Sequence, residues 1–486
     1  MRIAPPHLSL LLFILAAALR AAPAQAQTSS PFPPPDEQLG TYVANSGPGL
    51  DTGCTFRGGG PLRINVPLPV LVNPKQLNAD GTLKDAAKLV ANGVLSAQAT
   101  LRFPVFDIDD KAAVPGIAPE VDRVSFNGRF KKTLEGFNDT WTDDALVVPI
   151  DELKFGQDNE LRIDIDTANS NELWCMAVDW VSVEFVATPP YVLQHGISAD
   201  ASTWENSSAP GVLAALDKRG VLYTRFSLGT GAGGNGSVVA NAAELLANIG
   251  GYLAPLKSKQ VHVIAHSKGG LDTQAMQALA PDFEIVSLST LSTPHLGSVA
   301  ADLSIVQKQK ADDKINAGAD PNGYAASYLG TWTFGQGPQL PGLADLTTYA
   351  ATAALGGGQR GNIAGTYTIG ADADLNGDNA LTSNESSPLF PSAAHYAAER
   401  AWHVLRDFAS AKMTLATVPG RLWGTRTVLT YTTVQTATPQ ANDIVVTESS
   451  ANPGYGTPLG DSMANHSTVK SGANVDTILD TTIPLK

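Results

Sequence analysis

Between residues 189 and 291 the chain alternates short apolar runs with segments of helical periodicity. The apolar runs are YVLQ at 191–194, VLYTRFSL at 221–228, VHVIA at 261–265 and EIVSLSTL at 284–291. Strands that alternate with helices of about ten or more residues predict βαβ units, in which the strands are parallel. We therefore predict that residues 189–486 form an α/β domain around a doubly wound, mostly parallel sheet.

The preceding segment, residues 40–188, has a different pattern. Its apolar residues alternate with polar ones over short runs, and turn residues separate the runs. Asn127-Gly128 between two such runs predicts a two-residue hairpin turn, and residues 79–98 contain one helical segment. These features predict an all-β sandwich of jelly-roll type. Pro189-Pro190 marks the boundary with the α/β domain.

The first 26 residues have the pattern of a secretory signal peptide. Arg2 precedes an apolar core at 8–19, and Ala24-Gln25-Ala26 provides a small-x-small cleavage site. That core is too short to cross a bilayer, and no later run of about eighteen apolar residues follows, so we predict no transmembrane segment. We expect a secreted protein, extracellular or periplasmic in transit, in which residues 27–39 form a Pro-rich spacer without a fixed fold.

The net charge and the two cysteines narrow the functional classes. A formal net charge of −14 argues against nucleic-acid binding, which needs a basic surface. Cys54 and Cys175 form an even pair, which in an exported protein predicts a disulfide rather than two free thiols. That bridge would place residues 54–175 in a single domain.

The segment AHSKGG at 265–270 places a serine where a buried strand turns into a helix. A serine on such a tight turn projects its hydroxyl from the edge of the sheet, which is what a nucleophile requires. Small residues two positions before and after the serine let strand and helix approach each other, and Ala265 and Gly269 meet this need. We predict Ser267 as a nucleophile; the alternative is a serine in an ordinary turn. The Lys268 side chain is expected to point into a cleft or into solvent.

A nucleophilic serine needs a base, and four histidines follow Ser267. His466 lies in a polar loop near the C-terminus, from which its imidazole could reach the sheet edge. His395 and His403 fall in an apparent helix and are expected on ordinary helix faces. His295 follows the serine too closely to be the last member of a triad.

The acid that orients the base has several candidates. Asp443 lies on a loop after a strand-like segment, 23 residues before His466, and fits this role best. Asp461, five residues before the histidine, and the aspartates near residue 372 are the alternatives.

A second motif at residues 374–385 resembles a calcium-binding loop. Oxygen-bearing side chains occupy loop positions 1, 3, 5, 9 and 12, and a backbone carbonyl stands at position 7. The residues are Asp374, Asn376, Asp378, Ala380 through its carbonyl, Thr382 and Glu385. We predict a structural calcium ion here; the alternative is an acidic loop of Asx turns without a metal. No organic cofactor is predicted.

The last 300 or so residues resemble secreted bacterial lipases and esterases of the α/β-hydrolase fold. Four segments match this family in order: VLQHG, AHSKGG, LSTPHLGS, and NDIVVTESSA followed by ANHSTV. Ala265 and Ile444 stand where the family's usual pattern has glycine. The resemblance implies Ser267 as nucleophile, His466 as general base and then acid, and Asp443 as the residue that orients the imidazole. It further implies an oxyanion hole of two backbone N–H groups, those of Ile197 and Lys268.

These observations together predict a secreted serine hydrolase of carboxylic esters, a lipase or carboxylesterase whose residues 298–358 are a helical insert or an apolar lid. Residues 40–188 resemble accessory modules of secreted proteins, some of which bind carbohydrate. Trp141, Trp174 and Trp180 either stack on a polymer or carbohydrate surface or belong to the core. The alternatives are a polyester depolymerase that adsorbs through the sandwich, and a non-enzymatic binding or adhesion protein with an inactive hydrolase domain.

Overall fold

The computed structural model describes most of the chain as two compact units. The described residues are 30–44, 55–56, 60–110, 118–168, 174–205, 207, 209–230, 233–305, 340–392, 395–419 and 425–483. Unit 1 takes in residues up to 68 together with 79–83 and 97–186, and unit 2 takes in 69–78, 84–96 and 187–486. Each unit is described by itself.

Two short segments of unit 2 come from the part of the sequence that was assigned to the N-terminal domain. Residues 69–78 and 84–96 belong instead to unit 2. The side chains of Asn73 and Gln76 donate to Asp217, and the Asn92 amide donates to the Arg219 carbonyl oxygen. These hydrogen bonds join segments more than 120 residues apart, which a sequence boundary drawn at Pro189 does not reveal.

Unit 2 is built on a six-stranded sheet in which every neighbouring pair of strands is parallel, as the sequence predicts. In spatial order the strands are β12 (Tyr223–Arg225), β11 (Tyr191–Gln194), β13 (Gln260–His266), β14 (Glu284–Leu291), β15 (Thr366–Asp372) and β18 (Thr457–Met463). The chain runs outward from β11 to β12, then returns past β11 to β13. The connection that follows β11 leads to one side of the sheet and the connection that follows β13 leads to the other. In sheets of this kind, ligands bind at the carboxyl ends of two such neighbouring strands.

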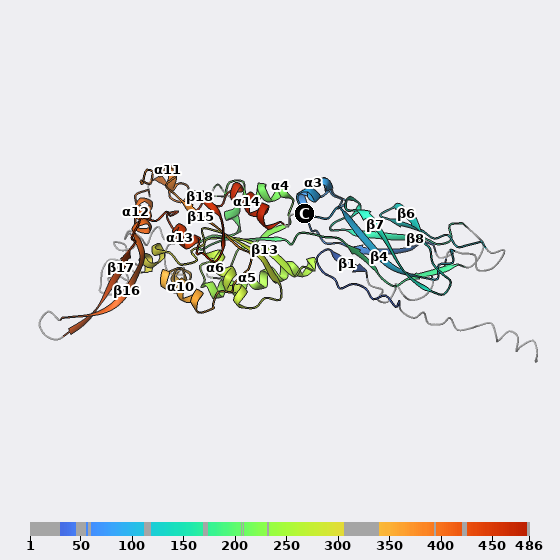
Figure 1. Ribbon diagram of the computed structural model, residues 1–486, viewed down its shortest axis with the longest axis horizontal. Helices are drawn as coiled ribbons and strands as arrows, with labels where there is room; N and C mark the ends of the chain where they lie inside the picture. The colour runs from blue at the N-terminus through green and yellow to red at the C-terminus, as the bar shows by residue number, and fades with distance from the viewer. Residues whose placement is uncertain are drawn as a thin grey trace, which may run out of the picture. The chain divides into compact units, whose positions relative to one another are not determined.

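Helices cover both faces of this sheet (Figure 1). The helices α4 (Val212–Arg219) and α14 (Gly472–Thr482) lie on one face, and α5 (Val238–Leu253) and α6 (Lys268–Ala278) lie on the other. Side-chain caps fix where several of them begin: Ser237 accepts from the Ala240 N–H at the start of α5, and Ser471 accepts from the Asn474 N–H at the start of α14. Within the described residues, none of the helices is both long and apolar enough to cross a membrane.

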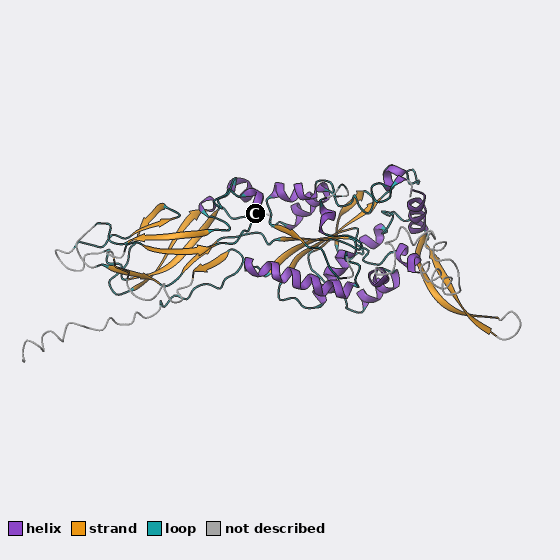
Figure 2. Ribbon diagram, turned by 180° about the vertical axis from the view of Figure 1, so that it is seen from behind, coloured by secondary structure: helices purple, strands orange, loops and turns teal. Residues whose placement is uncertain are grey.

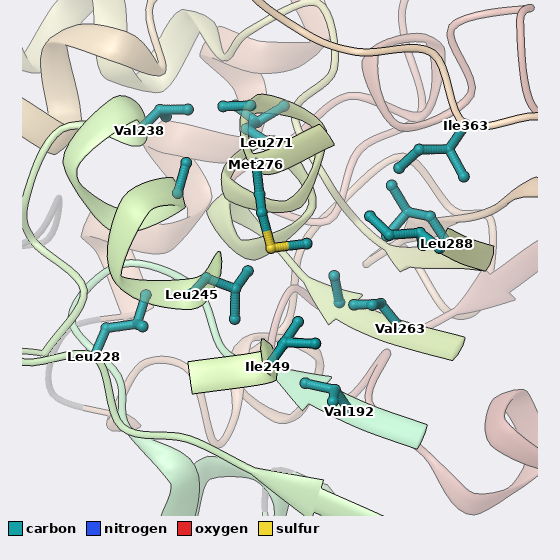
Figure 3. Close-up of a cluster of buried hydrophobic side chains, with 14 of the residues drawn as sticks. Val192, Leu228, Val238, Leu245, Ile249, Val263, Leu271, Met276, Leu288 and Ile363 are labelled. Carbon is teal, nitrogen blue, oxygen red and sulfur yellow. The ribbon is translucent and has the colours of Figure 1, made fainter. Parts of the chain in front are cut away.

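The main core of unit 2 lies between the sheet and the α5–α6 pair (Figure 3). Leu245 and Ile249 of α5, together with Met276 of α6, face Val192 of β11 and Val263 of β13, and all five are fully buried. Burying each such side chain contributes about 1.5–3 kcal/mol, so this core fixes α6, and with it Ser267, against the sheet.

Further elements lie beyond the central sheet in unit 2 (Figure 2). They are the helices α3 (Ala86–Ala91), α9 (Leu340–Asp345), α10 (Thr348–Gly356), α11 (Ser383–Ser386), α12 (His395–Asp407) and α13 (Glu448–Ala451), and the two-stranded hairpin of β16 (Phe408–Pro419) and β17 (Thr425–Gln435). Short 3-10 helices lie at Pro74–Gln76, Ala201–Trp204 (η4) and Ala254–Leu256. The helix α3 is the one predicted within 79–98, and Asp85 caps its N-terminus.

Unit 1 consists of two antiparallel sheets. The first contains β1 (Thr41–Ala44), β10 (Val181–Glu184), β4 (Gln98–Phe106), β9 (Cys175–Val178), β2 (Thr55–Phe56) and β7 (Trp141–Pro149). The second contains β3 (Leu62–Pro67), β8 (Asp158–Asp164), β5 (Arg123–Phe126) and β6 (Arg129–Thr133), and a short 3-10 helix lies at Ile150–Glu152. Asn127 and Gly128 join β5 to β6 with φ of 48° and 78°, which confirms the predicted hairpin turn.

Two expectations for unit 1 change with the structure. Residues 30–39, predicted to be an unstructured spacer, are held in place: Ser30 N–H donates to Asp179, and the Trp180 indole N–H donates to the Phe32 carbonyl. Trp180 is itself fully buried, so it belongs to the core and is not available to stack on a polymer or carbohydrate. Hydrogen bonds to the backbone of a Pro-rich segment leave no trace in its composition, which is why the spacer prediction was wrong for these residues.

Several predictions concern residues outside the described part of the chain. The signal peptide at 1–26 lies outside it, as do residues 27–29 of the spacer and residues 306–339 of the predicted insert or lid. Cys54 lies outside it too; no free cysteine occurs among the described residues, and the bridge to Cys175 stays a prediction.

Two buried carboxyls of unit 1 make its stability depend on pH. Glu120 and Asp122 are almost fully buried, and burial together with the Asp122 charge raises the pKa of Glu120 to about 9. A carboxyl whose pKa is raised by folding binds its proton more tightly in the native state. Its contribution to stability is therefore complete below the ordinary pKa and is lost as the pH rises toward 9.

We expect the melting temperature of the full chain to fall from pH 5 to pH 9, and Glu120→Gln to make that fall shallower. Glutamine keeps the shape of a protonated glutamate and cannot ionise. Thermal unfolding of both proteins at several pH values measures the effect. Parallel profiles for the two proteins would contradict this account of Glu120.

Candidate active site

Ser267 stands at the turn between β13 and α6, where the sequence places it. Its backbone has φ 56° and ψ −134°, values that a residue with a side chain seldom adopts. The Ser267 N–H donates to the Leu291 carbonyl at the end of β14, and its own carbonyl accepts from the Thr293 hydroxyl. These two bonds stabilise the unusual backbone and fix the direction of the serine side chain at the carboxyl edge of the sheet.

Close packing around the turn explains the residues on either side of Ser267. A Cβ at Gly269 would lie 2.5 Å from the His195 carbonyl oxygen, so this position must be glycine. Ala265, two residues before the serine, is completely buried in the main core, where its methyl group is accommodated. The small-residue requirement is therefore met on both sides, and alanine at 265 leaves the turn intact.

The structure brings His466 and Asp443 to Ser267. His466 Nε2 lies 2.9 Å from Ser267 Oγ, and His466 Nδ1 lies 2.7 Å from Asp443 Oδ2. The neutral imidazole that fits both bonds carries its proton on Nδ1, donates it to the carboxylate, and accepts the serine hydroxyl at Nε2. All three side chains are buried. This is the arrangement in which an imidazole can take the proton of the serine as its oxygen attacks an electrophile.

Asp443 is held by the backbone of its own loop. Its second carboxylate oxygen, Oδ1, accepts from the N–H groups of Val445 and Val446, at 2.9 and 2.7 Å. Ile444, between Asp443 and Val445, has a φ of 82° although its side chain is β-branched. This is the position where the resembled family has glycine, so the backbone turn is retained with isoleucine in its place. The isoleucine side chain is fully buried beside Ala373, Leu381 and Trp402.

Two backbone N–H groups near Ser267 have no acceptor within the described part of the chain. They belong to Lys268, directly after the serine, and to Ile197, on the loop after β11. These are the two N–H groups that the family resemblance implies for the oxyanion hole. Ile197 lines the same cavity as Ser267. A Cβ at Gly196 would lie 2.7 Å from Ser267 Cβ and 3.1 Å from Ser267 Oγ, so the Ile197 loop passes directly against the serine.

A buried histidine shapes that loop. The N–H of Leu228 donates to His195 Nε2, and His195 Nδ1 lies 2.8 Å from the Gly196 carbonyl oxygen. Burial lowers the pKa of His195, which keeps its ring neutral and able to accept through Nε2. His195 was not predicted to have this role, because Leu228 lies 33 residues away in the sequence.

The Lys268 side chain was predicted to point into a cleft or into solvent, and this prediction was wrong. It is fully buried, and its Nζ lies 2.7 Å from Asp272 Oδ1, one turn along α6. Asp272 Oδ2 accepts from Asn241 of α5. Residues four apart share a helix face, so the spacing of Lys268 and Asp272 could have indicated an ion pair. Which face of α6 packs on α5 was not visible in its sequence.

A second histidine precedes the serine and holds the loop of His466. His266 Nε2 lies 2.7 Å from the His466 carbonyl oxygen, and since burial holds the pKa of His266 well below its ordinary value, the ring is neutral and donates through Nε2. The Asn465 side chain accepts from the N–H groups of Ser467 and Thr468 and tightens the same turn.

Among the described residues, none of the remaining candidates hydrogen-bonds to Ser267. His295 is buried among Thr290, Gln274 and Tyr455, and burial lowers its pKa to about 3. His395 and His403 lie on α12, as expected for helix-face residues. Asp461 accepts from Asn452, and Asp372 accepts from the Asp374 N–H, so neither contacts His466.

The predicted calcium loop is held by its own hydrogen bonds. Asp374 accepts from the N–H groups of Gly377, Asp378 and Asn379, and Glu385 accepts from those of Leu375 and Thr382. Among the residues that the structure describes, no group of three or more acidic, histidine or cysteine side chains is arranged to hold a metal ion. Calcium binding therefore stays a prediction from the sequence pattern.

Comparisons with known proteins find short and distant similarities. No family model matches the chain. A 59-residue segment is 41% identical to the triacylglycerol lipases of Pseudarthrobacter phenanthrenivorans and Burkholderia plantarii; it is 12% of this chain, and 18% and 16% of those relatives. The crystal structure of the mature Bacillus licheniformis lipase BlEst2 gives a TM-score of 0.40 at 18% identity, over 61% of this chain and 92% of that chain. The chain thus matches less than a fifth of the length of the two triacylglycerol lipases.

The close approach of Gly196 to the serine yields a prediction about position 196. If the Ser267 hydroxyl is the reacting group, Gly196→Ala should lower ester-hydrolysis kcat/KM by about 10²-fold, since displacing a reacting atom by roughly 1 Å can cost that much. The rate on a short-chain p-nitrophenyl ester measures it.

Gly250→Ala provides the matched control. A Cβ at Gly250 meets nothing within 4 Å, and the residue lies inside α5, so alanine should leave the rate unchanged and add about 0.5–1 kcal/mol of stability. Equal rates for both variants would mean that the Gly196 loop does not border the reacting group.

Proposed function

We propose that this protein is a serine hydrolase of carboxylic esters, a lipase or carboxylesterase. The observation that carries the proposal is the hydrogen-bonded chain from Ser267 through His466 to Asp443 on the wall of a cavity. The 41% identity of a 59-residue segment to two triacylglycerol lipases supports the same class of reaction.

The proposed reaction has two halves. Ser267 Oγ attacks the ester carbonyl carbon while its proton passes to His466 Nε2, and a tetrahedral intermediate forms. As that intermediate collapses, His466 returns the proton to the leaving alcohol and an acyl-serine remains. A water molecule then attacks the acyl carbon and gives its proton to His466. Collapse releases the carboxylic acid, and the histidine returns the proton to Ser267.

Charge develops at two places during each half, and the site has a group for each. The imidazolium that forms on His466 lies against Asp443, whose carboxylate stays oriented by the N–H groups of Val445 and Val446. The oxyanion would accept from the N–H groups of Ile197 and Lys268, which have no acceptor among the described residues. Loss of one such donor typically costs about 10²–10³ in rate, because it acts mainly in the transition state.

Secretion and a β-sandwich accessory domain are part of the proposal. They are supported by the signal-peptide pattern of residues 1–26 and by the two antiparallel sheets of unit 1. A structural calcium ion at residues 374–385 is supported by the spacing of its oxygen-bearing residues alone. If it binds, EGTA should lower the melting temperature of wild type and leave that of Asp374→Asn unchanged. An unchanged wild type would contradict it.

The test of the proposed function is hydrolysis of p-nitrophenyl butyrate by wild type and by Ser267→Ala. We expect wild-type turnover, and a loss of at least about 10³-fold in kcat for the variant, because removing the nucleophile of such a triad removes the acyl-enzyme route. A fluorophosphonate probe should label wild type at Ser267 and fail to label the variant.

Ser125→Ala, on strand β5 of unit 1, is the matched control and should retain full activity and labelling. Equal turnover by wild type and Ser267→Ala would overturn the role of this serine. Absence of turnover on a panel from short esters to triacylglycerols, with the protein folded, would favour a non-enzymatic binding protein.

A further inference from the structure

The cavity beside Ser267 has a chemical character that the triad does not account for. It measures about 280 Å³ and is lined by twelve residues, among them Ser267, His466 and Ile197. None of the twelve is acidic, and Lys470 is the one lysine or arginine among them. Lys470 is therefore the one lysine, arginine or carboxylate side chain in the described wall of a small cavity that contains the candidate nucleophile.

Lys470 is buried and lacks a charged partner. It is 3% exposed, and its Nζ donates to the Thr203 hydroxyl at 3.0 Å. Within the described residues no carboxylate lies within 4.0 Å of that nitrogen. Burial lowers the pKa of Lys470 to about 8, and no neighbouring charge contributes to that shift. An ammonium group has three N–H donors, so the hydroxyl satisfies one of them.

The position of the ammonium group is fixed relative to the triad. Lys470 follows His466 by four residues on a single tight turn, in which Asn465 accepts from the N–H groups of Ser467 and Thr468. Ser471 then caps α14. Thr203 belongs to η4, on the segment that follows the Ile197 loop. The lysine thus joins the loop of the base to the segment that follows the proposed oxyanion loop, and both Lys470 and its partner Thr203 line the same cavity.

A tie between two segments does not by itself require a charge. A buried ammonium group without a counter-ion costs free energy, and a neutral side chain could bond to Thr203 without that cost. Asp200, the N-cap of η4, accepts from the Ser202 N–H and makes no ion pair with the lysine. The buried Lys268, by contrast, has its counter-ion in Asp272. Lys470 is the buried lysine whose counter-ion the described chain does not supply.

We propose that Lys470 binds a carboxylate of the substrate, so that the enzyme prefers esters that carry a carboxylate near the scissile bond. The inference rests on the proposed ester hydrolysis and names its substrate class. A charge-assisted bond to Lys470 would compensate the buried ammonium and orient the ester against Ser267. At about 280 Å³ the cavity has room for a short diacid monoester.

Two pairs of esters test the proposal, each an anionic ester and its neutral counterpart. The first pair is monoethyl succinate and diethyl succinate, with the carboxylate on the acyl side. The second is carboxymethyl butyrate and its methyl ester, with the carboxylate on the alcohol side. In wild type we expect kcat/KM to favour the anionic member of at least one pair, and Lys470→Met to lower that preference about tenfold or more. The pair that responds identifies the side on which the carboxylate binds.

Matched variants separate charge from structure. Lys470→Arg retains the charge and should keep part of the preference, whereas Lys259→Met removes an exposed lysine, paired with Asp282, and should leave it unchanged. If Lys470→Met does not fold, inhibition of ester hydrolysis by the wild-type protein tests the anion site instead. With p-nitrophenyl butyrate as substrate, succinate should inhibit at a concentration at least about tenfold lower than the neutral succinamide.

The outcomes distinguish this inference from the proposed function. Equal preference in wild type and Lys470→Met for both pairs, or equal inhibition by succinate and succinamide, would overturn the anion site and leave ester hydrolysis standing. If folded wild type hydrolyses neither these esters nor p-nitrophenyl butyrate, ester hydrolysis itself fails, and the anion site fails with it.

Discussion

The hydrogen bond between Ser267 Oγ and His466 Nε2 joins residues 199 positions apart, and much of unit 2 is arranged so that it can form. The serine follows the third strand of the sheet in chain order and the histidine follows the last. Parallel strands place both carboxyl ends at one edge, and the core between the sheet and α5–α6 keeps that edge rigid. The bond is therefore a product of topology: a chain with the same residues and a different strand order would not form it.

Local sequence was enough to select the three residues of this chain of bonds. A strand, a tight turn and a helix identify Ser267, and the requirement for a later acid and histidine selects Asp443 and His466 among a small number of candidates. The parallel sheet was likewise predictable, because apolar runs alternate with helical segments. The strand–turn–helix pattern and the alternation of apolar and helical segments are short-range, whereas Asp443 and His466 were selected by their order along the chain and by segments that resemble the hydrolase family.

The features that the sequence did not reveal depend on contacts over long distances. The direction of the Lys268 side chain depends on how α6 packs against α5. The role of His195 depends on an N–H group 33 residues away. The strand-like segment before Asp443 is β17, which pairs with β16 and not with the parallel sheet, and the Ala373 N–H donates to the carbonyl oxygen of Asn442, next to Asp443. The assignment of residues 69–78 to unit 2 likewise depends on a long-range contact, because the Asn73 side chain donates to Asp217.

The left-handed backbone at Ile444 has a consequence for how the protein loses activity on heating. A β-branched residue with φ of 82° stores about 1–3 kcal/mol of strain, and the burial of its side chain with Trp402 of α12 and Leu381 offsets that strain. If α12 detaches, the offset disappears and the loop is free to relax, carrying Asp443 away from His466. The position of Asp443 thus depends in part on the packing of Ile444 against Trp402 and Leu381, which are not among the reacting groups. A local opening at α12 would therefore displace the acid without unfolding the sheet.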